Sequence, residues 1–268
     1  TQQMNAEARN RLNMESKLRR AIDNDDFLLY YQPQVESDSL HVAGYEALIR
    51  WDDPESGMIF PDKFIPLLED TGLIVPVGEW VLRKACMDIT EIRKINDDFQ
   101  SISVNLSARQ FVDNTLVTRI ERILNETNVQ PENLVIEITE TILMTEAERS
   151  LQILNELSEI GLKLSLDDFG TGYSSLAYLK QFPISVIKID RSFVQDLHTD
   201  SSDMAICEAI IAIARQLKLK VVAEGVETQD QFEFMRERSC HSIQGYFFGK
   251  PVPLPELLTK VKGGRQMA

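Results

Sequence analysis

The stretch Leu162-Lys-Leu-Ser-Leu-Asp-Asp-Phe-Gly-Thr-Gly-Tyr-Ser-Ser175 joins an apolar run to two adjacent acids, Asp167 and Asp168. A loop bracketed by Gly170 and Gly172 follows, and a helical pattern comes after it. Adjacent carboxylates repel each other unless a positive charge lies between them, so the pair suits a divalent cation beside a phosphate ligand. The same residues also fit a plain strand end with an Asx turn and a helix cap. This stretch alone leaves both interpretations open.

The composition predicts a cytoplasmic protein without disulfides. The chain has 268 residues, 43% hydrophobic and 26% charged, which is enough for one large α/β domain or two small ones. Cys86, Cys207 and Cys240 lack paired short spacing, which argues against a disulfide framework or a zinc knuckle. No apolar run is long enough to span a membrane, and no signal peptide is present. Because the chain begins at Thr1, we expect a longer parent protein, and an anchor of that parent in the inner membrane stays open.

The charge balance limits the partners. A formal net charge of −14 argues against binding to duplex nucleic acid, which needs a basic surface. An acidic protein can still bind a phosphorylated ligand, but it then needs metal ions or a few well-placed Lys and Arg side chains. We expect no membrane contact by this part of the chain.

The start of the chain predicts a helix followed by a hairpin. Apolar residues recur at helical spacing over 4–22, which suits a linker helix, and an ordinary surface helix of the same domain is the alternative. Two β-type runs over 27–35 and 40–51 flank a turn signal, so we expect an antiparallel hairpin. We therefore expect a linker helix over 1–23, a folded domain over 24–262 and a flexible tail over 263–268.

Strands and helices alternate along the rest of the chain. We expect further strands over 102–105, 134–138, 162–167, 186–190, 220–224 and 242–245. We expect helices over 61–70, 77–95, 113–127, 146–160, 174–181, 203–217, 228–238 and 255–261. This alternation implies parallel pairing, and about eight strands in an α/β chain of this length fit a (β/α)₈ barrel. A doubly wound open sheet is the alternative, weakened because no Gly-rich dinucleotide fingerprint follows an early strand.

Nearly every expected strand carries a polar residue at or near its C-terminal end. These residues are Glu46, Asn105, Glu137, Asp167, Lys188, Glu224 and Gln244. Buried carboxylates are costly unless paired or metal-bound, and strand ends converge on one mouth of a barrel. The set forms an oxygen-rich cage that suits Mg²⁺, Mn²⁺ or Ca²⁺ better than zinc. The histidines His41, His198 and His241 lie outside these positions, and we interpret them as surface or structural residues.

Lys188 allows two functional interpretations. It can stay charged among carboxylates and hold a phosphate or an attacking water. A strand lysine in a barrel can also form a Schiff base, but this needs a lowered pKa, and nearby carboxylates raise the pKa of a lysine. The metal–phosphate interpretation therefore ranks above the Schiff base.

The segment Tyr45-Glu46-Ala47-Leu48-Ile49-Arg50-Trp51 carries the Glu-Ala-Leu signature, and the chain from about Leu28 to about Leu258 resembles bacterial EAL domains. Further matching segments are Tyr31–Gln34, Ser103–Ser107, Glu137–Glu140, Asp167–Ser175, Ile187–Asp190, Ala223–Glu227 and Gln244–Tyr246. The departures are small, with Ile49 where Leu is common and Cys240-His241 where Cys-Asp or Cys-Asn is more usual. The tripeptide alone is a weak match, whereas the ordered set is highly specific.

The resemblance implies a modified TIM barrel with an antiparallel first strand, which hydrolyses cyclic di-GMP to linear 5′-pGpG. It implies that Glu46, Asn105, Glu137 and Asp167 hold one Mg²⁺ or Mn²⁺. Asp167 would bridge to a second ion, supported by Asp168 and Glu224. The catalytic set would be Glu46, Lys188, which orients the water, and Glu224, a general base. Glu140 would hold the Asp167–Gly172 loop, and substrate contacts would come from Gln32, Arg50, Asp190, Glu227 and Gln244.

The main alternative from another class is an EAL domain that has lost catalysis and serves as a cyclic di-GMP receptor. Such domains usually lack a metal ligand, the lysine, the base or the loop pattern, and this chain has all of them. By resemblance we also expect a homodimer and an upstream GGDEF or sensory domain in the parent protein, joined through the helix over 1–23.

Overall fold

The computed structural model describes residues 2–96, 99–172, 176–197 and 201–262, without the side chains of 2–8 and 10. The expected flexible tail over 263–268, His198 and the start of the helix predicted over 174–181 lie outside the described residues. No helix in the described ranges is both long and apolar enough to cross a membrane.

The strands close into a barrel. Within the described residues the sheet has ten strands, and all but β3 (Gly57–Ile59) and β10 (Val252–Pro253) form a closed eight-stranded ring. The ring consists of β1 (Phe27–Glu36), β2 (Val42–Asp53), β4 (Ile102–Asn105), β5 (Leu134–Thr139), β6 (Lys163–Phe169), β7 (Val186–Ile189), β8 (Lys220–Ala223) and β9 (Ser242–Gln244). From β2 to β9 each strand of the ring is parallel to the next, whereas β1 is antiparallel to both β2 and β9. The barrel with an antiparallel first strand is therefore confirmed, and the open sheet is wrong.

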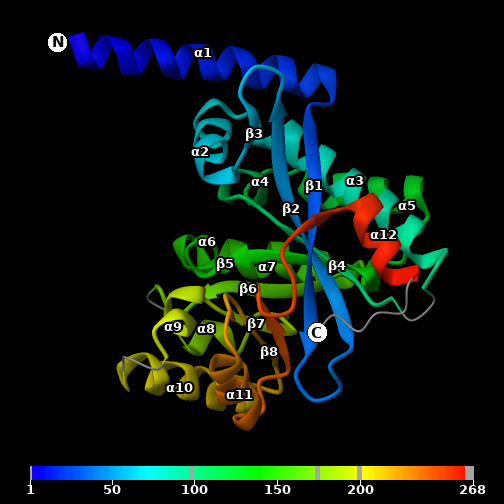
Figure 1. Ribbon diagram of the computed structural model, residues 1–268, viewed down its shortest axis with the longest axis vertical. Coiled ribbons are helices and arrows are strands. Elements are labelled where there is room, and N and C mark those ends of the chain that lie inside the picture. The colour runs from blue at the N-terminus through cyan, green and yellow to red at the C-terminus, as the bar shows by residue number, and fades with distance from the viewer. Residues whose placement is uncertain (1, 97–98, 173–175, 198–200, 263–268) are drawn as a thin grey trace.

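Helices surround the barrel (Figure 1). The longer ones are α1 (Gln2–Asn24), α2 (Pro61–Thr71), α3 (Ile74–Arg93), α5 (Leu116–Thr127), α7 (Ala147–Glu159), α10 (Ser201–Leu217), α11 (Gln229–Glu237) and α12 (Leu254–Lys262). Short helices are α4 (Ala108–Phe111), α6 (Glu140–Thr145), α8 (Leu176–Leu179), α9 (Arg191–Gln195) and the 3₁₀ turn η1 (Pro131–Asn133).

Some predicted boundaries are wrong for local reasons. The helix expected over 113–127 is α5, which begins three residues later than predicted. The short helix α4 before it was not predicted, and the capping box of Ser107 and Gln110 starts it. The helix α9 was not predicted, and it begins where the Asp190 side chain accepts a hydrogen bond from the backbone N–H of Ser192. Both helices are too short to show a hydrophobic period.

Alternation along the strands sorts polar from apolar side chains. On β5, Ile136 and Ile138 belong to the hydrophobic core, whereas Glu137 points the other way and reaches Lys188 of β7. The two neighbours of Lys188 on β7, Ile187 and Ile189, are fully buried in the same core. The main apolar core thus lies between the barrel and its helices, and charged groups occupy the upper interior of the barrel.

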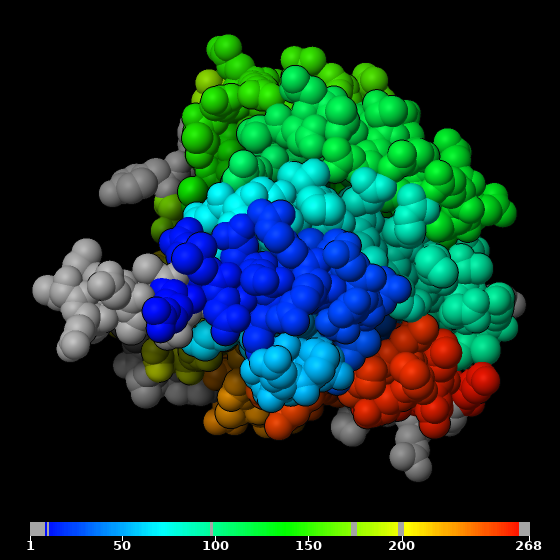
Figure 2. Space-filling model, turned by 90° about the horizontal axis from the view of Figure 1, so that it is seen from above, coloured from blue at the N-terminus to red at the C-terminus, as the bar shows by residue number. Residues whose placement is uncertain are grey.

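The C-terminal half of α1 packs on the domain. Leu18 and Ala21 are fully buried, and the Nζ of Lys17 lies 2.8 Å from a carboxylate oxygen of Asp53 at the end of β2. Seen from above in Figure 2, α1 in dark blue lies across the segment coloured light blue and cyan that follows β2. The predicted domain boundary between residues 23 and 24 stays a prediction.

Candidate active site

A β-bulge directs two acids to the mouth of the barrel. In the β6–β7 pairing Leu166 lies opposite Ile187 and Phe169 lies opposite Ile189, so Asp167 and Asp168 together face the single residue between them, Lys188. Asp168 has a φ of 53°, a left-handed backbone that aspartate tolerates better than most residues. Successive strand residues normally point to opposite faces, and a bulge re-aims one of them. The bulge therefore lets both carboxylates serve one site.

Lys188 occupies the centre of a carboxylate cluster. Its Nζ lies 2.5 Å from Glu137 Oε2, 2.5 Å from Glu224 Oε1, 3.3 Å from Asp167 Oδ1 and 3.7 Å from Glu46 Oε2. The lysine side chain is 1% exposed, and the four acids come from β2, β5, β6 and the end of β8. The structure thus brings together the strand-end residues that the sequence singled out.

The cluster shifts the pKa of its members. Burial disfavours the ammonium, but the carboxylates of Asp167, Glu137, Glu224 and Glu46 outweigh it and raise the pKa of Lys188 well above its usual value. This argues against a Schiff base at Lys188, which needs a lowered pKa. Burial raises the pKa of Glu137 to about 8. Burial, together with the negative charge of the neighbouring Asp167, raises the pKa of Asp168 to about 6. Burial also raises the pKa of Glu224 well above its usual value.

Glu46 is held by two amides. Asn105 Nδ2 donates to Glu46 Oε1 at 2.6 Å, and Gln244 Nε2 donates to Glu46 Oε2. The same Gln244 nitrogen lies 3.2 Å from Gln32 Oε1, and Gln34 donates to Gln244 Oε1 at 2.9 Å. These contacts hold Glu46 and the three glutamines together at the antiparallel strand β1, where Gln32 lies opposite Glu46 and Gln34 lies opposite Gln244.

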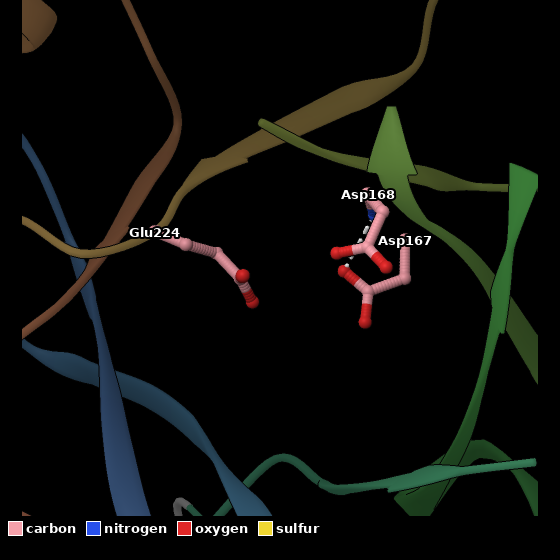
Figure 3. Close-up of side chains that lie close together, drawn as sticks. All are labelled: Asp167, Asp168 and Glu224. Carbon is pink, nitrogen blue, oxygen red and sulfur yellow. Dashed lines mark hydrogen bonds between the residues drawn. The ribbon is translucent and has the colours of Figure 1, made fainter. Parts of the chain in front are cut away.

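The donor set fits divalent cations. Figure 3 shows Asp167 and Asp168 at the end of β6 and the Glu224 side chain pointing toward them from the end of β8. Each of these three acids offers one oxygen, and the three oxygens all lie within 4.8 Å of one another. With Glu46, Glu137 and the amide oxygen of Asn105 nearby, the ligands are oxygens, as Mg²⁺ and Mn²⁺ prefer.

Glu140 contacts the loop that follows the bulge. Its Oε2 accepts a hydrogen bond from the backbone N–H of Gly170 at 3.0 Å, and the residue is 1% exposed. A Cβ at Gly172 would lie 2.7 Å from Glu140 Oε1, so the loop approaches this carboxylate closely only because Gly172 has no side chain. The expected contact between Glu140 and the loop is therefore present.

A cavity at the mouth, here called the polar cavity, brings in residues that sequence reasoning missed. Predicted residues among its lining are Gln32, Glu46, Asp167, Glu224, Glu227 and Gln244. Unpredicted ones are Arg191 and Gln195 of α9 and Tyr246, which is 56% exposed. Arg191 is exposed, and its Cβ would lie 2.6 Å from a Cβ at Gly225, so a glycine there makes room for it. Arg191 and Gln195 were missed because the short helix that carries them, α9, was not predicted.

Two residues predicted to contact the substrate, Asp190 and Arg50, are not among the described residues that line the polar cavity. Asp190 is half-buried, and its carboxylate caps α9, so within the described residues it is not part of the polar cavity. Arg50 is 9% exposed and lies further along β2 than Leu48, which lines the polar cavity. Leu48 also lines a second, apolar cavity together with Pro61, Ile65 and Leu106, which we call the apolar cavity. Their roles toward a substrate stay predictions.

His41 and His241 lie away from the cluster. Both are exposed, and His241 Nδ1 accepts a hydrogen bond from the backbone N–H of Val221 at 3.2 Å. Among the described cysteines, Cys86, Cys207 and Cys240 are buried and free. The hydrogen bond from the backbone of Val221 supports the structural interpretation of His241.

In this barrel the strands from β2 to β9 run parallel, and a lysine and an acidic cluster lie at their C-terminal ends. This arrangement is typical of barrel enzymes, whose sites lie at that end. Residues 15–251 match the EAL domain family. The chain therefore belongs to the EAL domain family.

Relatives and solved structures agree with this. The chain is 46% identical over 258 residues to the bifunctional diguanylate cyclase/cyclic di-GMP phosphodiesterase MucR of Pseudomonas aeruginosa, covering 96% of this chain and 38% of that protein. It is 41% identical over 257 residues to the cyclic di-GMP phosphodiesterase NbdA of the same organism, covering 96% and 33%. The solved complex of the MucR phosphodiesterase with c-di-GMP aligns with a TM-score of 0.89 and 46% identity, covering 91% of this chain and 99% of that one. The chain thus spans well under half of these curated relatives.

Proposed function

We propose that this domain is a divalent-metal-dependent phosphodiesterase that hydrolyses cyclic di-GMP to linear 5′-pGpG. The observation that carries the proposal is the buried Lys188, whose ammonium is surrounded by four carboxylates, one of which belongs to the Asp167–Asp168 bulge. Similarity to named cyclic di-GMP phosphodiesterases supports the substrate.

The metal ligands follow from the positions of the oxygens. We propose that Glu46, Asn105, Glu137 and Asp167 hold one Mg²⁺ or Mn²⁺, and that Asp167, Asp168 and Glu224 hold a second. Bound there, such ions neutralise phosphate charge and lower the pKa of a water molecule. The raised pKa of Glu137 and Asp168 means that both acids release protons when they become ligands.

The residues of the chain then position the reactants. Lys188 stays charged, and its ammonium can donate to the attacking water or to a phosphate oxygen once ligands draw the carboxylates away. Glu224 lies at the rim with its side chain 18% exposed, where it can accept the proton that the water loses. The water oxygen bonds to phosphorus and the P–O3′ bond breaks. The 3′ oxygen leaves as a hydroxyl group after taking a proton from solvent, to which Glu224 then returns the proton that it accepted.

The walls of the mouth suit a dinucleotide. The polar cavity offers amides from Gln32, Gln195 and Gln244, which can hydrogen-bond sugar, phosphate or base edges. The apolar cavity beside it, with Leu48 on the shared wall, offers a surface for a purine ring. Negative charges of the ligand need cations besides the metal ions, and Arg50 and Arg191 are the arginines that we propose for them.

Product analysis separates an enzyme from a receptor. The purified domain is incubated with cyclic di-GMP and Mg²⁺ or Mn²⁺, with a chelator control and the Glu46→Ala variant. Chromatography should show linear pGpG only for the wild-type domain incubated with metal. The chelator control and the Glu46→Ala variant should give no product. Binding of cyclic di-GMP without product in either metal at high protein concentration would favour the receptor, and absence of binding would overturn both functions.

We further propose that the domain is one module of a longer regulated protein and acts as a homodimer. The small share of the curated relatives that it spans supports the first point, and the packing of α1 beside α2 and the end of β2 offers a path for a signal. The homodimer rests on the family resemblance, and sedimentation of the purified domain tests it.

A further inference from the structure

Arg50 lies on the same face of β2 as the metal-ligand candidate Glu46. Alternate strand residues share a face, so Glu46, Leu48 and Arg50 follow one another outward from the barrel. At a rise of about 3.3 Å per residue, Arg50 lies roughly 13 Å along the strand from Glu46. On the neighbouring strand, Tyr30 lies opposite Leu48, so it is a diagonal neighbour of Arg50 on this face.

Arg50 is a buried cation without an acidic partner. It is 9% exposed, and no ion pair to it exists among the described residues. Its Nη1 donates to the backbone carbonyl of Ile49 at 2.8 Å, which leaves its other N–H groups for a ligand. A buried charge is costly unless it is paired, so this position calls for an anion that is brought by something else.

Two aromatic rings take the place of an acidic partner. The Arg50 Cζ lies 5.6 Å from the ring centroid of Tyr30 and 5.2 Å from that of Phe60. An aromatic face attracts a guanidinium without neutralising its charge. Without these rings, the acidic groups at the mouth of the barrel would attract the flexible Arg50 side chain inward. Glu46, on the same face of β2, is the first acidic group along that face.

Phe60 is a poor choice for its local backbone position. It stands at the N-cap of α2, where Ser, Thr, Asp or Asn would accept a backbone hydrogen bond, and it makes no such bond. It is also 55% exposed. Neither helix capping nor core packing explains a phenylalanine here, whereas the contact with Arg50 does.

We propose that Tyr30 and Phe60 are positioning residues whose rings hold the Arg50 guanidinium outward, ready to bind the second phosphodiester of the cyclic dinucleotide. The first phosphodiester occupies the metal centre near Glu46. This inference rests on the proposed function, because it needs a ligand with two separated phosphates.

Substitution of Phe60 separates a π contact from apolar bulk. We expect Phe60→Leu to weaken binding of cyclic di-GMP about two- to fivefold, through KM and not kcat, and Phe60→Tyr to bind like the wild type. Because Phe60 is more than half exposed, the thermal midpoint should stay within a degree or two of the wild type in both variants.

A double-mutant cycle tests whether Phe60 acts through Arg50. In an Arg50→Ala background, Phe60→Leu should cause no further loss of binding. The same loss in that background would overturn the inference, because the ring would then contact the ligand by itself. No loss from Phe60→Leu in the wild type would overturn it as well.

A ligand-free measurement keeps this test apart from the proposed function. The NMR signal of the Arg50 Nε–H group should be shifted upfield by the rings, and Phe60→Leu should reduce that shift. An unchanged signal overturns the contact whatever the substrate is. Failure of the wild type to bind cyclic di-GMP, with the ring shift present, would overturn the second-phosphate role together with the proposed function.

Discussion

The Nζ of Lys188 lies 2.5 Å from Oε2 of Glu137 inside the barrel, and each side chain is 1% exposed. The two residues belong to β7 and β5, with β6 between them, so the pair bridges across the strand that carries the bulge. Breaking such a pair strands buried charge, which costs far more than an exposed ion pair contributes.

Replacing Lys188 should therefore weaken the metal-free fold. We expect Lys188→Met to lower the free energy of unfolding by about 3 kcal/mol, because four carboxylates lose their shared cation. Urea unfolding with a chelator measures this loss. Lys163, exposed at the start of β6, gives the matched control Lys163→Met, which should change little. Equal stability of the two variants would contradict the central role of Lys188.

The pH should affect stability in a defined direction. Burial raises the pKa of Glu137 to about 8 and that of Asp168 to about 6, above the ordinary values of 4.5 and 3.8. The folded state therefore binds these protons more tightly, so their contribution to stability is full below about pH 4 and is lost as pH rises through 6 and 8. Compared with Asp168→Asn, the metal-free wild type should lose stability between pH 4 and 7. A stability difference between the two proteins that does not change across that range would contradict this prediction.

The same groups couple metal binding to proton release. Ligation needs the ionised carboxylates, so adding Mn²⁺ near pH 7 should release the proton of Glu137 and any proton that Glu224, whose pKa is also raised, still carries. The share released by Glu137 should decline as the pH rises past 8. Calorimetry in buffers that differ in ionisation enthalpy counts these protons. Binding without proton release at pH 7 would mean that Glu137 is already ionised or is not a ligand.

Glu140 should affect metal affinity through the loop. Its carboxylate holds the backbone N–H of Gly170, two residues after Asp168, so Glu140→Ala should loosen the acidic pair. We expect Mn²⁺ affinity to fall about tenfold, as for other residues that support metal ligands. Glu140→Gln, which keeps an acceptor for Gly170, serves as the control and should lose less. An unchanged Mn²⁺ affinity in Glu140→Ala would show that the contact between Glu140 and the loop does not support metal binding.

Arg191 should contribute to substrate binding. It is an exposed arginine that lines the polar cavity together with Glu224 and Glu227, and it makes no ion pair with the described residues. Arg191→Ala should raise KM about tenfold with kcat nearly unchanged, as for a lost charge-assisted hydrogen bond. Arg191→Lys should recover part of the loss, and Lys163→Ala on the surface should have no effect. A fall in kcat alone would place Arg191 in the chemical step.

Sequence reasoning predicted the barrel and most of the acidic cluster for one reason. Polar residues at successive strand ends, such as Glu137 and Lys188, must meet if the strands are parallel and close into a ring. The antiparallel first strand came mainly from the family resemblance, since an early hairpin fits many folds.

Other features depend on register and on tertiary contacts that a sequence does not display. The bulge at Asp167 and Asp168 is defined only by pairing with β7, where two residues face one. The contact between Arg50 and the ring of Phe60 depends on the chain after β2 folding back, because the two residues are ten positions apart. Arg191 was missed because α9 has only five residues, too few for a helical period.

The most direct test of the central claim is a reaction in ¹⁸O-labelled water with Mg²⁺ or Mn²⁺ and excess enzyme, analysed by mass spectrometry. We predict that cyclic di-GMP gives linear pGpG with one ¹⁸O on the 5′-phosphate, and that the product is lost in Lys188→Ala. The central claim would be contradicted by intact cyclic di-GMP at high enzyme concentration in both metals, or by equal product formation in Lys188→Ala.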